Sequence, residues 1–114
     1  MFKVSNNRVV KDWPVIISVP QDGGRVMKYE AKVDFEIIAQ PEQDAIYANA
    51  GNDVTLLNRT VIGWPDGQFQ GADESPLLFN DESKAQLFAI SYVRQAFTAA
   101  YLLAFNGREG QRKN

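Results

Sequence analysis

Carboxylates form the one group of side chains in this 114-residue chain whose types and spacing could do chemistry. Five of them gather in one stretch: Asp66, Asp73, Glu74, Asp81 and Glu82. Paired carboxylates can perform acid–base catalysis on a glycosidic bond, and carboxylate oxygens can bind Ca²⁺ or Mg²⁺. The spacing matches no calcium-binding loop, however, and roles in turns and at helix starts account for each residue. We therefore expect neither a catalytic residue nor a metal site.

The composition excludes most other catalytic machinery, because the chain contains no cysteine and no histidine. Ser-His-Asp and Cys-His arrangements, the usual zinc sites and disulfides all need one of these two residue types. The glycines Gly23, Gly24 and Gly67 lack the spacing of a phosphate-binding loop and are typical of turns. We therefore expect no nucleophile or metal site built on these residue types, and no cofactor.

Charge is distributed unevenly along the chain, although the net charge is only −2. Residues 1–38 carry a net charge of +1, residues 39–83 carry −7 and residues 84–114 carry +4. The acidic middle and the basic end could pair within one chain or between copies, and high salt would weaken either pairing. The negative total disfavours a nucleic-acid partner. With neither a targeting segment nor an apolar stretch of about 20 residues, we also expect no membrane partner.

The first 38 residues predict β-structure. From Met27 to Ile37 apolar residues alternate strictly with charged ones, which is the period of a strand with one buried face. Before this run, Trp13, Val15, Ile17 and Val19 share one parity, and the turn-forming residues 21–24 separate the two runs. We predict an antiparallel hairpin of residues 13–19 with 25–38, which becomes a small sheet if residues 7–11 add a third strand.

Two short helices are predicted after the hairpin. Pro41 near a helix start indicates a helix of residues 40–50, and Asp53 is a candidate N-cap for a second one. The chain then enters a turn around Trp64. The residues expected to form this turn, or to pack its junction with the last helix, are Trp64, Asp66, Gly67, Leu78 and Phe79. The fold class is α+β, in a single domain (1–114) with a β-rich part (1–38) and a mainly helical part (39–114).

The last helix is predicted to be the longest element, from Asn80 or Asp81 to Gly107. Between Ala99 and Phe105 it has no polar face. A chain this small is not expected to bury a helix end on all sides, so we predict that part of it contacts another subunit or a client. The predicted interaction residues are Tyr92, Phe97, Tyr101, Leu102 and Phe105. The alternative is that this end is the central core element of one chain.

Residues 33–114 present a series of short motifs in a definite order. They are Val33–Ile38, Val61–Trp64, Asp66 and Gly67, an acidic loop, residues 76–79 before the capped helix start at 80–83, Tyr92 followed by an alanine-rich helix, and the terminal Lys113-Asn114. In this order, rather than in strict identity, the sequence resembles the tail assembly chaperone proteins of long-tailed bacteriophages and prophages. The resemblance covers about two thirds of the chain.

The resemblance implies a non-enzymatic role in assembly. Proteins of that family bind the long, largely helical tape measure protein before the tail tube polymerises around it, keep it in solution and help to bring tail tube protein to it. For this chain the resemblance implies tape measure protein and tail tube protein as partners, and it allows a homo-oligomer. It also implies that the protein acts in the cytoplasm of the bacterial host and is absent from the mature virion. Two other classes stay open: a structural tail or head-tail completion protein of the virion, and a small phage nucleic-acid-binding protein.

Overall fold

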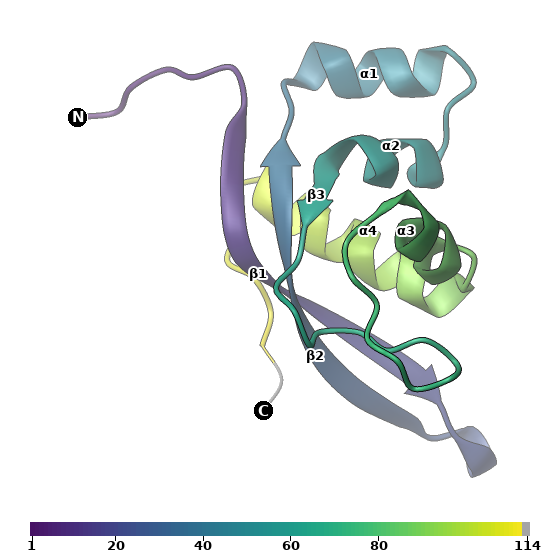
Figure 1. Ribbon diagram of the computed structural model, residues 1–114. Helices are drawn as coiled ribbons and strands as arrows, with labels where there is room; N and C mark the ends of the chain where they lie inside the picture. The colour runs from purple at the N-terminus through teal and green to yellow at the C-terminus, as the bar shows by residue number, and fades with distance from the viewer. Residues whose placement is uncertain (113–114) are drawn as a thin grey trace.

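The computed structural model describes residues 1–112 and has an α+β architecture, which confirms the predicted fold class (Figure 1). The strands are β1 (Arg8–Pro20), β2 (Val26–Ile37) and β3 (Val61–Gly63), in the order β1-β2-β3 in one antiparallel sheet. The helices are α1 (Gln40–Ala48), α2 (Asp53–Thr60), α3 (Asp81–Phe88) and α4 (Ser91–Phe105), and the 3-10 turn η1 (Asp22–Gly24) joins β1 to β2. The terminal Lys113-Asn114 motif lies outside the described residues.

Strand β1 is continuous, and residues 7–11 do not form the separate strand that the sequence suggested. An extra residue between Val10 and Trp13 shifts the pairing with β2 by one position. At this bulge Asp12 has a φ of 55°, and its backbone N–H donates to the carboxylate of Asp34 at 2.9 Å. The shift changes which parity of β1 faces the core, so the apolar residues before and after the bulge lie on one face.

The apolar face of the hairpin is buried along only part of its length. We define the hairpin base as residues 13–17 and 31–35, and the hairpin tip as residues 18–30. At the base, Val33 and Phe35 are completely buried, and α4 packs against β1. Trp13 Nε1 fixes this contact by donating to the carbonyl of Ala100 in α4 at 2.9 Å. The tip extends past the helices into solvent (Figure 1).

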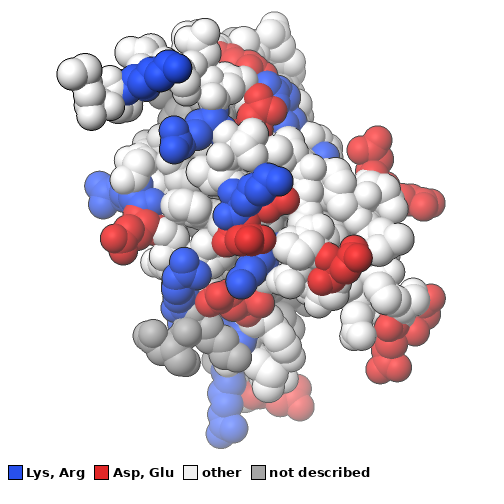
Figure 2. Space-filling model, turned by 60° about the vertical axis from the view of Figure 1, so that its left-hand side comes forward, with Lys and Arg blue, Asp and Glu red and all other residues white. Residues whose placement is uncertain are grey.

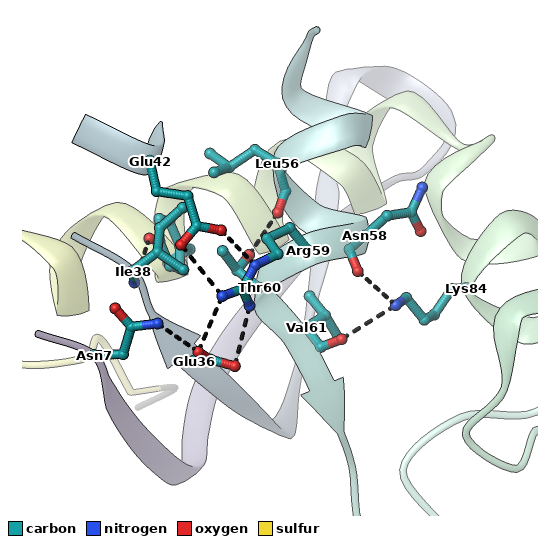
Figure 3. A network of polar contacts seen from close by, with 11 residues as sticks. Asn7, Glu36, Ile38, Glu42, Leu56, Asn58, Arg59, Thr60, Val61 and Lys84 are labelled. Carbon is teal, nitrogen blue, oxygen red and sulfur yellow. Dashed lines mark hydrogen bonds and ion pairs between the residues drawn. The ribbon is translucent and has the colours of Figure 1, made fainter. Parts of the chain in front are cut away.

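A polar network joins α1 and α2 to the sheet (Figure 3). Arg59 of α2 lies between Glu36 of β2 and Glu42 of α1, with its Nη1 3.0 Å from Glu36 Oε1 and its Nε donating to Glu42. Asn7 Nδ2 also donates to Glu36, at 2.7 Å. Hydrogen bonds from Arg59 and Asn7 hold the pKa of the Glu36 carboxyl below its usual value. The network thus fixes both short helices over the end of β2.

The two short helices begin close to the predicted positions. Helix α1 starts beside Pro41 and ends at Ala48, two residues before the predicted end. Helix α2 is capped by Asn52 rather than by Asp53: Asn52 Oδ1 accepts from the Thr55 N–H at 3.2 Å, and Thr55 Oγ1 accepts from the Asn52 N–H at 3.2 Å. This reciprocal pair satisfies two N–H groups that a helix start leaves open.

Lys84 of α3 is buried and closes the C-terminal end of α2 (Figure 3). Its Nζ donates to the carbonyl oxygens of Asn58 at 3.0 Å and of Val61 at 3.2 Å. The ammonium also lies 5.3 Å from the centroid of the Phe79 ring. Burial lowers the pKa of Lys84, and the nearby charge of Asp81 opposes that shift. Lys84 therefore acts as a structural link between α3, α2 and β3.

The predicted long last helix is two helices, α3 and α4, which meet at 107°. The chain leaves helical geometry at Ile90, which is extended (φ −94°, ψ 117°) and gives α4 no side-chain cap. Arg94 Nη1 donates to the carbonyl of Phe88 at 2.8 Å and so satisfies an acceptor at the end of α3. The bend brings Phe88 of α3 edge-to-face with Phe97 of α4, at a centroid distance of 5.2 Å. The sharp turn therefore lets both helices bury their apolar stripes in one core.

Trp64 attaches the loop between β3 and α3 to the core. Its indole Nε1 donates to the carbonyl of Leu77 at 3.1 Å. Its ring packs edge-to-face against Phe69 and Phe79, at centroid distances of 5.0 and 4.9 Å. Trp64 and Phe79 thus lie at the junction for which the sequence proposed them.

The turn after Trp64 contains Asp66 and Gly67, and Gly67 has a φ of 84°, which glycine adopts without strain. Leu78, by contrast, is 58% exposed. Its predicted role in packing the junction is therefore corrected, because the neighbouring Phe79 fills the space beside Trp64 instead.

Candidate protein-interaction surface

Phe97 and Tyr101, two of the predicted interaction residues on α4, are completely buried within one chain. The Phe97 ring lies 5.9 Å from the Phe69 ring, and the Tyr101 ring lies 5.7 Å from the Phe35 ring. The Tyr101 hydroxyl accepts a hydrogen bond from the Ile38 N–H at 3.4 Å, and burial raises its pKa. Both residues belong to the core, as the alternative interpretation expected, because the sheet covers this side of α4.

Other side chains of α4 are partly open to solvent. Tyr92 and Leu102, both predicted interaction residues, are 38% and 37% exposed, and the exposed Ala99 lies between them at helical spacing. Phe105 is half-buried, with its ring 5.8 Å from the ring of Tyr101. The interaction surface predicted on this helix is therefore reduced to Tyr92 and Leu102, with Phe105 at its edge.

Tyr92 also lies on a groove between α4, the loop after Trp64 and the hairpin, which we call the tip groove. Its volume is about 310 Å³. The lining residues are Ile17, Val19, Tyr29, Glu30, Ala31, Gln68, Phe69, Gln70, Tyr92 and Val93. Gln68 holds the loop beside β2, because its Oε1 accepts from the Lys32 N–H at 2.8 Å. The groove thus combines a buried aromatic floor at Phe69 with two exposed tyrosines.

The apolar face continues from the tip groove along the hairpin tip. Val19 pairs with Met27 and Ile17 pairs with Tyr29, so these four side chains share one face of the ribbon. Met27 and Tyr29 are 48% and 50% exposed. Contiguous apolar side chains at the surface of a small protein usually mark an interaction site.

Sequence reasoning missed Met27 and Tyr29 as surface residues, because their alternation with charged residues predicts burial. The length of the strand relative to the helix could have revealed their exposure. Strand β2 has 12 residues and spans about 40 Å, whereas α4 has 15 residues and spans about 22 Å. A single helix crossing the hairpin cannot cover an apolar face of that length.

Residues 1–112 contain neither a cluster of possible metal ligands nor a single helix that could span a membrane. No group of three or more Asp or Glu side chains is placed to hold a metal ion in the part of the chain that the structure describes. Within the same residues no single helix is long and apolar enough to cross a membrane; α3 and α4 reach that length only as a pair bent by 107°.

Comparisons of the chain with protein families, with curated proteins and with solved structures find no match in any of the three. The tip groove and the exposed side of α4 are therefore interpreted from their own residues.

Proposed function

We propose that the protein is a tail assembly chaperone of a long-tailed bacteriophage or prophage, which binds the tape measure protein and promotes tail tube assembly without catalysing a reaction. Two things support the proposal: the resemblance of residues 33–114 to that family, and an apolar surface of the kind such a task requires. In this role the protein acts in the cytoplasm of the bacterial host and leaves the assembly before the virion is mature.

The tip groove is the observation that carries the proposal. A largely helical client presents apolar side chains at positions i, i+3, i+4 and i+7, and an apolar groove can take such a stripe. Tyr29, Phe69 and Tyr92 all line the groove, and of these three rings Phe69 is buried whereas the two tyrosines are exposed. Tyrosines suit a reversible contact, because each combines a large apolar ring with a polar hydroxyl. The Tyr29 hydroxyl donates to Met27 Sδ at 2.9 Å, which orders the two side chains beside the groove.

A small groove could keep a long client in solution if many copies of this protein bind along the client. One groove of about 310 Å³ takes only a few side chains. Several copies on one client act at high effective concentration, so that weak individual sites give strong total binding. Weak single sites also allow tail tube protein to displace the copies one at a time.

Co-expression with the tape measure protein of the same phage tests the proposal. The soluble fraction of the tape measure protein and its co-purification with this chain are measured with the wild type and with the double variant Tyr29→Ser, Tyr92→Ser. We expect the wild type to keep the client in solution. The double variant should lose co-purification, because it removes both exposed aromatic rings that line the groove.

Tyr47→Ser is the matched control, because Tyr47 is an equally exposed tyrosine on α1, outside the tip groove. It should leave co-purification unchanged. A client that stays insoluble with the wild type, or an equal loss with Tyr47→Ser, would contradict the proposal.

A second candidate function is a structural tail or head-tail completion protein of the virion. The projecting hairpin favours it, because a two-stranded ribbon with exposed edges can add to the sheet of a neighbour. Mass spectrometry of purified particles separates the two candidates. A chaperone should be absent, and abundant copies in stoichiometric amount would favour the structural protein.

A further inference from the structure

A cleft with a basic rim lies where the C-terminal segment returns to the start of β1, and it is separate from the tip groove. We call it the basic cleft, and its volume is about 510 Å³. Its apolar lining residues are Val10, Trp13, Ile37 and Ala104, and its charged lining residues are Arg8, Arg108, Glu109 and Arg112. Three arginines against one glutamate give the rim a net positive charge. A cleft of this size with an apolar floor can take a few side chains of a partner.

The C-terminal segment is held in place beside the cleft. Gly107 ends α4 with a φ of 70°, and the Arg108 N–H donates to the carbonyl of Leu103 at 2.8 Å. Gly110 lies directly on β1: a Cβ at this position would be only 2.6 Å from Pro14 Cγ. This close contact requires glycine, so the segment that carries the arginines is seated on the strand.

An exposed loop on the other side of the hairpin has the complementary composition. Residues 73–82 run from this loop into the first turn of α3, and we call them the acidic loop. They contain four carboxylates and no basic residue. Leu78 projects from this loop with 58% of its surface exposed, and Phe79 beside it is partly exposed. The part of the loop before Leu78 is ordered by a bridge between Gln70 and Pro76 and by a 2.9 Å hydrogen bond from Leu77 to Phe69.

The basic cleft and the acidic loop lie on opposite sides of one chain. The C-terminal segment contacts β1 through Gly110, whereas the loop after Trp64 contacts β2 through Gln68. Figure 1 shows the two segments on either side of the hairpin. In Figure 2 the right-hand edge of the molecule carries acidic side chains, whereas basic and acidic side chains are mixed over the rest of the visible face. The two surfaces are thus presented to other molecules rather than to each other.

We propose that the basic cleft of one chain binds the acidic loop of a second copy, with Leu78 entering the apolar floor and the carboxylates facing Arg8, Arg108 and Arg112. Charge complementarity selects this occupant, because the chain itself supplies an exposed apolar side chain within a run of carboxylates. The contact is head-to-tail, so a pair of bound copies leaves one cleft and one loop open for further copies. Such an interface produces rings or helical arrays rather than closed dimers.

This inference does not depend on the tip groove or on the identity of a client. The two surfaces are separate, since the basic cleft and the tip groove have no lining residue in common. A head-to-tail contact through the basic cleft and Leu78 uses no lining residue of the tip groove. If the chaperone proposal also holds, the array supplies the repeated copies along a client that avidity requires.

Sedimentation of the purified full chain at about 100 µM tests the association. We expect species larger than a dimer that increase with protein concentration. Raising NaCl from about 50 mM to about 500 mM should raise the apparent dissociation constant at least about tenfold, because salt screens the contact between the arginines and the carboxylates. A wild type that stays monomeric in both salt concentrations would overturn the proposal.

Two complementary variants identify the surfaces. Arg8→Glu with Arg108→Glu breaks the cleft and keeps the loop, whereas Leu78→Asp breaks the loop and keeps the cleft. Each variant alone should be monomeric. Their equimolar mixture should form a heterodimer and nothing larger, because only one intact cleft meets one intact loop. The remaining cleft and loop are both acidic, so they repel each other.

Lys28→Glu on the hairpin tip is the matched control, because it reverses an exposed charge outside both surfaces. It should associate like the wild type, and circular dichroism should show that all variants keep the native fold, since the substituted side chains are exposed. Variants that remain oligomeric on their own, or a mixture without a heterodimer, would exclude the head-to-tail contact.

Discussion

The base and the tip of the hairpin have the same alternating sequence pattern but opposite environments. At the base, Val33 and Phe35 are completely buried under α4 and the surrounding helices. At the tip, Met27 and Tyr29 occupy the same face of the same strand and are about half exposed. A period of two identifies the apolar face of a strand, but what covers that face depends on the helices. The same pattern therefore gives a core face at the base and a solvent-exposed apolar face at the tip.

The largest effect is expected at the base. Phe35→Ala should lower the free energy of unfolding by about 3–5 kcal/mol, because it removes a fully buried ring and leaves a cavity among packed neighbours. Urea denaturation at neutral pH measures the change. Tyr29→Ala, on the same face at the tip, is the matched variant and should cost far less. Equal losses at the two positions would show that the tip is also packed.

Two lysines, one buried and one exposed, show the same difference between a packed region and the hairpin tip. Lys84 is buried and donates to two backbone carbonyls, whereas Lys28 at the tip is exposed. Lys84→Met should therefore cost about 1–3 kcal/mol, because two carbonyl oxygens lose their hydrogen bonds. Thermal unfolding compares it with Lys28→Met, which should remain within about 0.5 kcal/mol of the wild type. A neutral Lys84→Met would mean that solvent reaches the end of α2.

Acidification should weaken the polar network that fixes α1 and α2 to β2. The hydrogen bonds from Arg59 and Asn7 lower the pKa of Glu36 in the folded state below its usual value of 4.5. Their contribution is fully present above the unfolded-state pKa and is lost as the pH falls through the lower folded-state pKa. Unfolding free energies measured from pH 6 downward should therefore decline below about pH 4.5, the usual pKa of this carboxyl.

Glu36→Gln separates this contribution from those of other carboxylates. The variant cannot lose a charge at position 36, so its decline below the same pH should be shallower than that of the wild type. Arg59→Ala removes the partner instead and should cost about 1 kcal/mol at neutral pH, since the pair is partly exposed. Identical pH profiles for Glu36→Gln and the wild type would assign the acid sensitivity to other groups.

Much of the fold follows from local sequence signals. The alternation in β2 and the proline beside α1 gave correct element types, and Asn80 caps α3 as expected, with its Oδ1 accepting from the Ser83 N–H at 2.8 Å. The order of strands, short helices and a final helical region was therefore predictable. Each of these signals involves residues that are close in the chain, which is why sequence alone is enough to read them.

Features with a tertiary cause could not be predicted in the same way. The break between α3 and α4 has neither a proline nor a glycine at residues 89–91, and the bond that supports it comes from Arg94, in the following helix. The bulge at Asp12 is visible in the sequence only as a change of parity, which a separate strand would also produce. Tyr92 was identified from the helix pattern, but the groove it lines needs the hairpin, which lies far away in the sequence.

The smallest effect on stability is expected at the hairpin tip. Substitutions there test directly whether the tip differs from the base. Met27→Ser with Tyr29→Ser should change the unfolding free energy by less than about 0.5 kcal/mol per site, because both side chains are already about half in water. Lys28→Ser, on the opposite face of the same strand, controls for altered strand propensity. The double variant should nevertheless lose binding to a client, so that stability and binding respond to different parts of one strand. A stability loss above about 1.5 kcal/mol, or unchanged client binding, would mean that the apolar tip is part of the core rather than a surface kept for a partner.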